Sequence, residues 1–400
     1  MNRIWASISF GFLSFSAQFA AAATPLTETR LMEFAQQNPH WNNVQLARQQ
    51  VWDIKLKQAG RWADPRLEWD QESIDRGGRT ERETILWLRQ DLSPWGSSEL
   101  EQELVEKQNQ SEQLVLDVQQ QAIKLKLRQQ FYSALEVQKQ MEALARYQSQ
   151  LTEMTKVVEQ RWKKGDVSRF DLLRIQNALA AADVELVGLQ KQSIIHLQTL
   201  SEWVEHPIEQ LEGALLPSIR TLETMHLSRN PLLQQVSLQL EQGETAQQLA
   251  QKQRYWPDLN VGIGYKQSNE INTSNGFQIG LSLSLPLFSQ KKYAVELAQT
   301  QHQQASAEKH FLQQKLEVEF NHYLAQLHES INQANRWQTI IEQQNRPMVE
   351  LARTSYRVGE LTISELLDVY RSELNHRKQY LSSALQAREH FFQIQYLLGE

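Results

Sequence analysis

The clearest pattern in the chain is a strict alternation of apolar and polar residues over two neighbouring segments, at about 258–266 and 277–286. Apolar side chains occupy every second position: Leu259, Val261, Ile263, Tyr265, and then Phe277, Ile279, Leu281, Leu283 and Leu285. Alternation over this length is typical of a strand with one buried face. The segment 267–276 is rich in Asn, Ser and Gly, so the two strands are predicted to form a hairpin.

A weaker copy of this hairpin is predicted at about 66–92. Leu67 and Trp69 alternate with Glu68 and Asp70, and the loop between the strands contains two adjacent glycines. The run from 84 to 92 is apolar in both phases, so the pattern does not indicate which of its faces is outside. The chain is therefore expected to contribute four strands.

Long helical segments follow each predicted hairpin. Neither Pro nor Gly occurs from 97 to 164 or from 287 to 346. A helix over 97–163 would be roughly 100 Å long at 1.5 Å per residue. Its sparse apolar seam among Gln, Glu and Lys is typical of a coiled coil and not of a globular core. Gly165 and Gly359 mark helix ends, after which helices return.

The same order of elements occurs twice along the chain. Three proline pairs, Pro39 with Pro231, Pro65 with Pro257, and Pro94 with Pro286, are each 192 residues apart, whereas Gly165 and Gly359 are 194 apart. An internal repeat indicates units that pack on each other. The expected division is a first repeat over 24–211 and a second over 212–400. The first holds a helix at about 28–59 broken at Pro39, the hairpin 66–92, a long helix 97–163 and a return helix 168–203. The second holds a helix, the hairpin 258–286, a long helix 288–357 and a return helix 362–398.

Strand length and alternation suggest a membrane β-barrel. Each strand has about 9–11 residues, which is enough to cross a bilayer when tilted, and one face is apolar while the other is small or polar. A soluble sandwich hairpin would show the same periodicity. Four strands cannot close a barrel, and open edges are not tolerated in lipid. Three chains would supply twelve strands, although two or four chains would also remove the edges. The predicted class is thus an α+β membrane protein with a long helical coiled-coil barrel and a trimeric barrel of twelve strands.

Composition narrows the location and the chemistry. The net charge of −6 gives no basic face for nucleic acid. The N-terminus resembles a secretory signal peptide over 1–23, with Arg3, a mostly apolar stretch and four alanines, although a membrane anchor is the alternative. No later apolar run reaches about 18 residues, so no transmembrane helix is expected. The absence of cysteine excludes disulfides, thiolate metal sites and a lipidated N-terminal Cys.

The order of elements and the two glycine turns resemble the TolC family of outer-membrane efflux channels. Segment 355–362 reads Ser-Tyr-Arg-Val-Gly-Glu-Leu-Thr and resembles the family's Tyr-x-Val-Gly-x-x-Thr tip; 161–168 is its counterpart. Segment 285–288 resembles the strand-to-helix junction. The resemblance covers about 24–400. It implies a homotrimer in the outer membrane of a Gram-negative bacterium, with a periplasmic helical tunnel closed at its tips. It also implies that the channel serves a tripartite efflux or type I secretion system that exports small molecules or metal ions. The expected partners are outer-membrane lipid, a periplasmic adaptor (membrane fusion protein) and an inner-membrane pump of the RND or ABC type.

The resemblance also assigns roles near the tips. Glu365 and Asp368 match the acidic pair that constricts the pore, and three copies would give two acidic rings that favour cations. They are also the acids expected at any helix start. Asp171 and Tyr356 match positions that help keep the tips closed. The family's Arg is replaced by Leu361, so Arg357 or Arg169 is a candidate substitute. The residues expected to dock the adaptor are Gly165, Asp166, Val358, Gly359 and Thr362.

Enzymatic chemistry has no support in the residues. The chain shows no nucleophile triad, no phosphate loop and no metal spacing among its ten histidines, so neither a metal nor a cofactor is expected. Gly262-x-Gly264 lacks the third glycine and the following helix of a dinucleotide loop. The alternative to a channel is a periplasmic coiled-coil adaptor or scaffold, which would explain the long helices but has no need of four strands with an apolar face.

Overall fold

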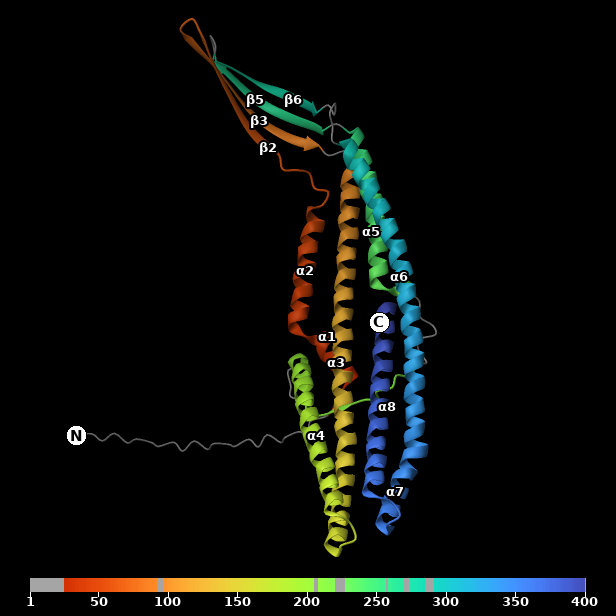
Figure 1. Ribbon diagram of the computed structural model, residues 1–400. Coiled ribbons are helices and arrows are strands. Elements are labelled where there is room, and N and C mark those ends of the chain that lie inside the picture. The colour runs from red at the N-terminus through yellow and green to blue at the C-terminus, as the bar shows by residue number, and fades with distance from the viewer. Residues whose placement is uncertain are drawn as a thin grey trace, which may run out of the picture.

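The computed structural model describes residues 25–92, 96–204, 208–219, 227–256, 258–269, 273–284 and 291–399. The expected signal peptide, the junction at 285–288 and Pro94, Pro257 and Pro286 lie outside these residues. A small sheet stands at one end of an elongated layer of helices, and the helix tips form the other end (Figure 1).

Helices make up most of the described chain. In order they are α1 (Glu28–Gln37), α2 (Pro39–Gln58), α3 (Ser97–Lys164), α4 (Arg169–Val204), α5 (Pro231–Tyr255), α6 (Lys291–Ile340), α7 (Arg346–Val358) and α8 (Ile363–Leu398). A short 3₁₀ turn, η2 (Leu227–Arg229), precedes α5. Asn38 and Asn230 cap α2 and α5 by accepting backbone N–H bonds, and a proline follows each cap. The proline pair 39 and 231 therefore marks equivalent helix starts in the two repeats.

The first long helix is continuous, whereas the second is interrupted. α3 runs for 68 residues without a break. The single helix expected over 288–357 is instead divided by a π turn, η3 (Ile341–Asn345), in which the N–H of Arg346 donates to the carbonyl of Ile341 five residues earlier. Pro347 follows the turn; it lacks an N–H and its ring crowds the carbonyl four residues before it. A π turn takes one extra residue, which accounts for one of the two residues by which the repeat spacing drifts.

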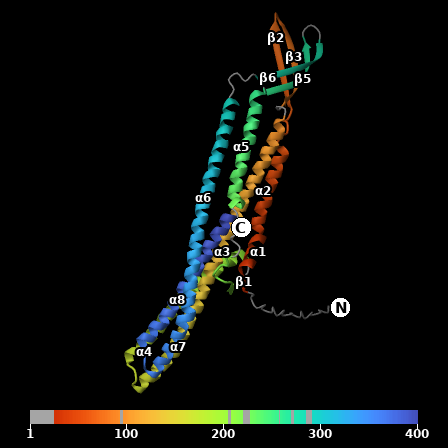
Figure 2. The ribbon, with the colours of Figure 1, turned by 90° about the vertical axis from the view of Figure 1, so that its right-hand side faces the viewer.

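The helices form a curved layer with two edges. α2 and α4 pack on one side of α3, α2 near the sheet and α4 toward the tips. On the other side of α3 lie α5 above and α8 below, and α6 packs against both (Figures 1 and 2). The layer therefore ends in α2 and α4 at one edge and in α6 at the other.

The sheet is antiparallel and contains both predicted hairpins. Its strands are β2 (Arg66–Arg76), β3 (Arg79–Leu92), β5 (Asp258–Asn269) and β6 (Thr273–Ser284), in the order β2-β3-β5-β6. The hairpins meet through β3 and β5, so within the described chain β2 and β6 each have one edge without a neighbouring strand. A second, two-stranded sheet pairs β1 (Leu26–Thr27) with β4 (Leu211–Glu212) and was not expected from the sequence.

The core lies in the lower two thirds of the layer. One cluster joins α1, the middle of α3, the upper parts of α4 and α8, and α6; its central side chains include Phe131, Leu200, Leu327 and Phe392. A second cluster extends to the tips around Met154, Tyr356 and Tyr370. The described helices include none that is both long and apolar enough to cross a membrane. The predicted α+β class, with long helices and a four-stranded antiparallel sheet, is confirmed, while closure of a barrel by further chains stays a prediction.

Candidate functional site

One face of the four-stranded sheet is apolar and uncovered. Two rows cross all four strands in register: Leu67, Leu88, Ile263 and Ile279 form the first, and Trp69, Leu86, Tyr265 and Phe277 form the second. Phe277 is 81% exposed and Ile279 85% exposed. Soluble proteins seldom expose a continuous apolar patch of this kind, so the face is built to contact an apolar environment.

The opposite face is polar and closely fitted around one tryptophan. Trp87 lies over Gly264 and Gly280, and a Cβ at Gly264 would come within 2.7 Å of its ring. The glycines of β5 and β6 are thus required by the close approach of this ring. The contact also settles the ambiguous phase of segment 84–92, because Trp87 and Arg89 lie on the polar face while Leu86 and Leu88 lie on the apolar one.

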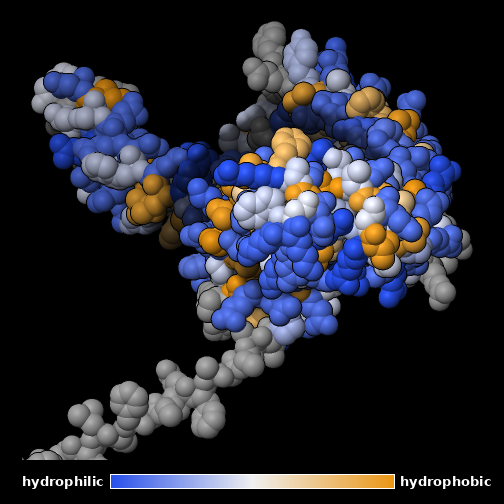
Figure 3. Space-filling model, turned by 60° about the horizontal axis from the view of Figure 1, so that its bottom comes forward, coloured by the Kyte–Doolittle hydropathy of each residue, from blue (hydrophilic) through white to orange (hydrophobic). Residues whose placement is uncertain are grey.

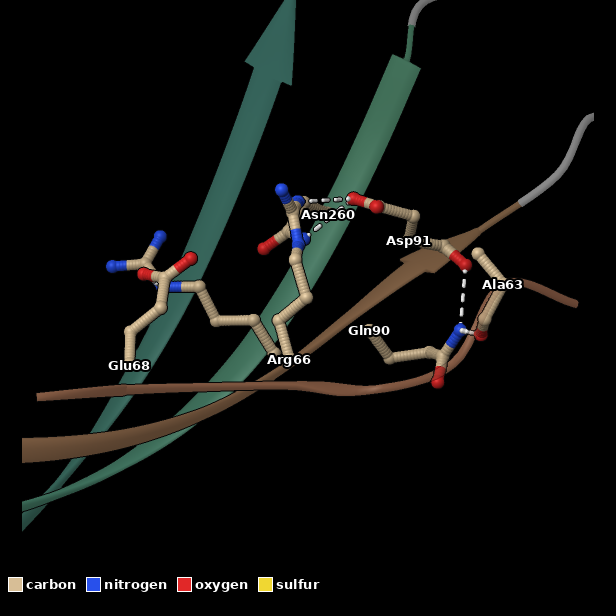
Figure 4. Close-up of polar contacts among 7 residues, drawn as sticks. Ala63, Arg66, Glu68, Gln90, Asp91 and Asn260 are labelled. Carbon is tan, nitrogen blue, oxygen red and sulfur yellow. Dashed lines mark hydrogen bonds and ion pairs between the residues drawn. The ribbon is translucent and has the colours of Figure 1, made fainter.

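Charged side chains form pairs across the strands of the polar face. The Arg66 guanidinium and the Asn260 amide converge on the Asp91 carboxylate at 3.0 and 2.7 Å (Figure 4). Arg89 pairs with Glu68 at 2.8 Å, and Lys266 pairs with Glu83. Cross-strand pairs of opposite charge stabilise register. The sheet therefore has two unlike faces, one apolar and one polar and charged.

Gly165 and Gly359 end α3 and α7, as expected from the sequence. Gly165 and Gly359 have φ of 83° and 89°, in the left-handed region that favours glycine. Their N–H groups donate to the carbonyls of Trp162 (2.9 Å) and Tyr356 (3.2 Å). Four exposed residues lie on these turns or beside them: Asp166, Val358, Glu360 and Thr362. The two turns are thus accessible surfaces at the same end of the molecule (Figure 1).

Two of the predicted gate carboxylates also cap helices. Asp171 accepts from the N–H and hydroxyl of Ser168 at the start of α4. Glu365 and Thr362 form a reciprocal capping box at the start of α8. The backbone and hydroxyl hydrogen bonds from Thr362 lower the pKa of Glu365, so its negative charge persists in more acidic solution.

The carboxylate of Asp368 is less engaged in hydrogen bonds than that of Glu365. It lies three residues further along α8, on the same exposed side of the helix. Its side chain is 68% exposed, and its carboxylate lies 3.6 Å from the Arg371 guanidinium. Of the acidic pair Glu365 and Asp368, Asp368 therefore presents the more available carboxylate, whereas Glu365 also caps the start of α8.

Two helix pairs meet near the tips: α3 with α4, and α7 with α8. Tyr356 is buried where these pairs meet. The Arg161 guanidinium of α3 donates to the Tyr356 carbonyl at 2.7 Å and lies 5.2 Å from the centre of its ring. Burial raises the pKa of the Tyr356 hydroxyl; Arg161 acts against this shift and the charge of Asp171 adds to it. Among the described residues the hydroxyl has no hydrogen-bond partner. Asp171 and Tyr356 are thus close enough to interact electrostatically without a hydrogen bond.

A second link joins the same helices. Glu153 of α3 pairs with Arg357 at 2.6 Å and with Arg353 at 3.4 Å, both from α7. Arg357, one of the two substitutes suggested for the missing family Arg, therefore bridges the helix pairs, while Leu361 packs against the lower core. We call this set the tip clasp: Arg161, Glu153, Arg353, Arg357 and the Tyr356 carbonyl. Sequence reasoning missed Arg161 and Glu153, because 195 and 204 residues separate them from their partners.

The described side chains do not form a metal centre. No group of three or more His, Cys, Asp or Glu among these residues is arranged to hold a metal ion. The Tyr323 ring contacts the rings of both His322 and His390, and burial, with the neighbouring His322, lowers the pKa of His390. This trio is a packed aromatic contact between α6 and α8.

Comparison with known proteins agrees with the resemblance. Residues 224–400 match the family model for outer membrane efflux protein. No curated protein sequence matches the chain. The fold is similar to the outer membrane protein VceC of Vibrio cholerae, with a TM-score of 0.74, 15% identity and coverage of 93% of this chain and 96% of that one. It is also similar to the CmeC outer membrane channel of Campylobacter jejuni, with a TM-score of 0.73, 13% identity and coverage of 100% and 93%. The open state of the MtrE outer membrane channel of Neisseria gonorrhoeae gives 0.72, 14%, 93% and 88%.

These findings bear on two of the expectations. The resemblance to the outer-membrane channel family is confirmed by the family match and by the shared fold. The expectation that the chain is not an enzyme is confirmed by the same match, since the family is one of transport proteins. At these identities the likeness to each solved structure concerns the fold.

Proposed function

We propose that this chain, which belongs over residues 224–400 to the outer membrane efflux protein family, is one third of an outer-membrane channel. The observation that carries the proposal is the sheet: one face is apolar and exposed, the other is charged, and β2 and β6 have open edges within the described chain. Lipid covers the apolar face, and β6 of one copy pairs with β2 of the next, because open edges are not tolerated in a bilayer. Three copies place twelve strands around a hydrated pore.

The helical layer extends this pore into the periplasm. The layer is curved, and its edges lie below those of the sheet: α2 lies on the side of β2 and α6 on the side of β6 (Figures 1 and 2). Three copies therefore close the layer into a tunnel beneath the barrel. The chain itself supplies a passage, and an inner-membrane pump supplies the energy. An adaptor docks on the exposed tips around Gly165, Asp166, Val358, Gly359 and Thr362 and links the channel to the pump. The cargo is a small molecule or a metal ion.

The tip clasp holds the tunnel closed. It ties α3 of the first helix pair to α7 of the second, and Arg174 adds a hydrogen bond to Ser364 between α4 and α8. Opening the tips requires the two pairs to separate, so these bonds must break first. An adaptor that docks on the adjoining glycine turns would break these bonds.

Neutralising the acids at the start of α8 tests the gate assignment. The double variant Glu365→Gln and Asp368→Asn keeps side-chain size, and Gln can still complete the capping box. In planar bilayers we expect it to lower the preference for cations and to weaken block by multivalent cations, because rings of carboxylates favour cations in a narrow pore.

Glu329→Gln serves as the matched control, since Glu329 is an exposed acid of α6 far from the tips. This control is expected to leave the reversal potential in a salt gradient unchanged. If the double variant also keeps the wild-type reversal potential, Glu365 and Asp368 do not line the constriction.

A further inference from the structure

A cavity opens at the edge of the helical layer, midway between the sheet and the tips. It has a volume of about 320 Å³ and lies where α1 meets α2, against α3 and the upper end of α4. Its apolar lining includes Trp41, Val44, Ile123 and Trp203. Two tryptophans beside an open apolar hollow form a site that a large apolar side chain would fill.

Two features show that this edge is incomplete in a single chain. α2 has twenty residues, and none of them is buried. The Trp41 indole nitrogen is shielded from solvent, yet none of the described residues accepts its hydrogen bond. A buried indole N–H usually has an acceptor, and a helix in a stable protein usually buries one face. The described residues of one chain therefore do not supply the contacts that this edge lacks.

The other edge of the layer carries a matching apolar stripe. Tyr293, Phe311 and Val318 of α6 are 66%, 69% and 64% exposed. Their spacings of 18 and 7 residues place them on one side of the helix at 3.6 residues per turn. This side is roughly opposite the buried Ala298, Ala305 and Leu316, which pack against the rest of the chain. Apolar side chains are scattered over a mainly hydrophilic surface in the space-filling view (Figure 3).

The internal repeat places Phe311 at the height of the cavity. α3 and α6 both begin at the sheet and run toward the tips, so residues 192 apart lie at about the same height. The cavity residues 120–124 of α3 correspond to 312–316 of α6. Phe311 therefore protrudes from one edge of the layer at the level where the other edge is hollow.

We propose that the cavity at Trp41 and Trp203 receives Phe311 from a second copy of this chain. The inference rests on the proposed channel, because β2 and α2 lie on one side of the molecule while β6 and α6 lie on the other. Pairing β6 of one copy with β2 of the next thus brings α6 of the first beside α2 of the second (Figure 1). Each of three interfaces then holds one phenylalanine between two tryptophans, and this contact seals the tunnel wall between barrel and tips.

Cysteine cross-linking of the full chain in detergent tests the contact. The chain has no cysteine, so introduced thiols are the only ones present. Oxidation of the variant that carries Phe311→Cys and Val44→Cys is expected to give covalent species of up to three chains on a non-reducing gel. The matched control combines Val44→Cys with Ala305→Cys, which lies on the packed side of α6, and is expected to remain a single chain.

A second measurement uses single substitutions. Phe311→Ala is expected to lower the temperature at which the detergent-solubilised trimer dissociates, whereas Phe311→Leu retains most of the wild-type value because it still fills the hollow. The proposal is overturned if the trimer is intact, no cross-link forms and Phe311→Ala dissociates like the wild type. If the wild-type chain itself forms no oligomer, the proposed channel fails, and this outcome is distinct from failure of the contact alone.

Discussion

Replacing Arg388 by Ala is expected to lower the free energy of unfolding of the chain by about 3 kcal/mol, judged from the loss of charge-assisted hydrogen bonds. Arg388 extends from α8 to the segment that connects the two repeats. Its Nη2 donates to the carbonyls of Ala214 and Leu216 at 2.6 and 2.9 Å, and its Nε donates to Leu215 at 2.8 Å. Removal of the side chain leaves three carbonyls without their donor.

The size of the effect follows from the surroundings of Arg388. Its guanidinium lies 4.5 Å from the ring centre of Tyr132, and burial lowers the pKa of the side chain. Each hydrogen bond from a charged group contributes about 1.5–3 kcal/mol, and the three bonds share one donor group, so the total is less than their sum. We call the three hydrogen bonds from Arg388 the clamp. Its loss also weakens the adjoining β1–β4 pair, which Gln138 holds through two hydrogen bonds to Leu211.

Urea unfolding followed by circular dichroism checks this prediction. The control is Lys292→Ala, which removes a solvent-exposed ion pair with Glu296 on α6 and is expected to cost less than about 0.5 kcal/mol. Equal losses in the two variants would mean that the clamp does not stabilise the connection between the repeats.

The double variant Arg161→Ala and Glu153→Gln is expected to shift the gate toward its open state by about 100-fold. It removes the charge-assisted bond to Tyr356, worth about 1.5–3 kcal/mol, and the cation–π contact, worth about 0.5–1 kcal/mol. It also removes the pairs of Glu153 with Arg353 and Arg357, which are partly exposed and contribute at most about 1 kcal/mol each. A sum near 3 kcal/mol corresponds to about two powers of ten in the equilibrium between closed and open tips.

Single-channel recording measures this shift as the fraction of time in the conducting state. The control is Lys163→Gln, which removes a tip charge paired with Glu159 on the same helix and leaves the link between the helix pairs intact. A variant with the open fraction of the wild type would show that the tip clasp does not hold the gate.

The elements with a strong period were predictable from the sequence, whereas contacts between distant residues were not. Strict alternation placed β5 and β6, and the absence of Pro and Gly placed α3, because these signals are local. The face of segment 84–92 could not be assigned, since it depends on Trp87 packing over glycines of another strand. The π turn before Pro347 and the two-residue strands β1 and β4 are too short to produce a periodic signal.

The residues of the candidate site also fall into those that local motifs revealed and those that only the fold brings together. The glycine turns and the acids that follow them were visible as motifs, and the structure places them together at one end. The capping by Asp171 and Glu365 follows from the spacing of Ser168 and Thr362 before them. The tip clasp joins residues about two hundred positions apart and required the fold.

The two repeats are alike near the sheet and unlike toward the tips. Asn38 and Asn230 cap equivalent helices, and the hairpins add equal numbers of strands. Toward the tips, only the second long helix contains a π turn, and α3 supplies Arg161 and Glu153 while α7 supplies Tyr356, Arg353 and Arg357. The second repeat is therefore the part in which we expect the gate to move.

Native mass spectrometry of the full chain, extracted from membranes in detergent, tests the central claim most directly. The open edges of β2 and β6 and the apolar face of the sheet predict an assembly that requires detergent to remain in solution, and the proposed channel predicts that it contains three copies. A chain that stays soluble and monomeric without detergent would contradict the channel and favour a periplasmic scaffold.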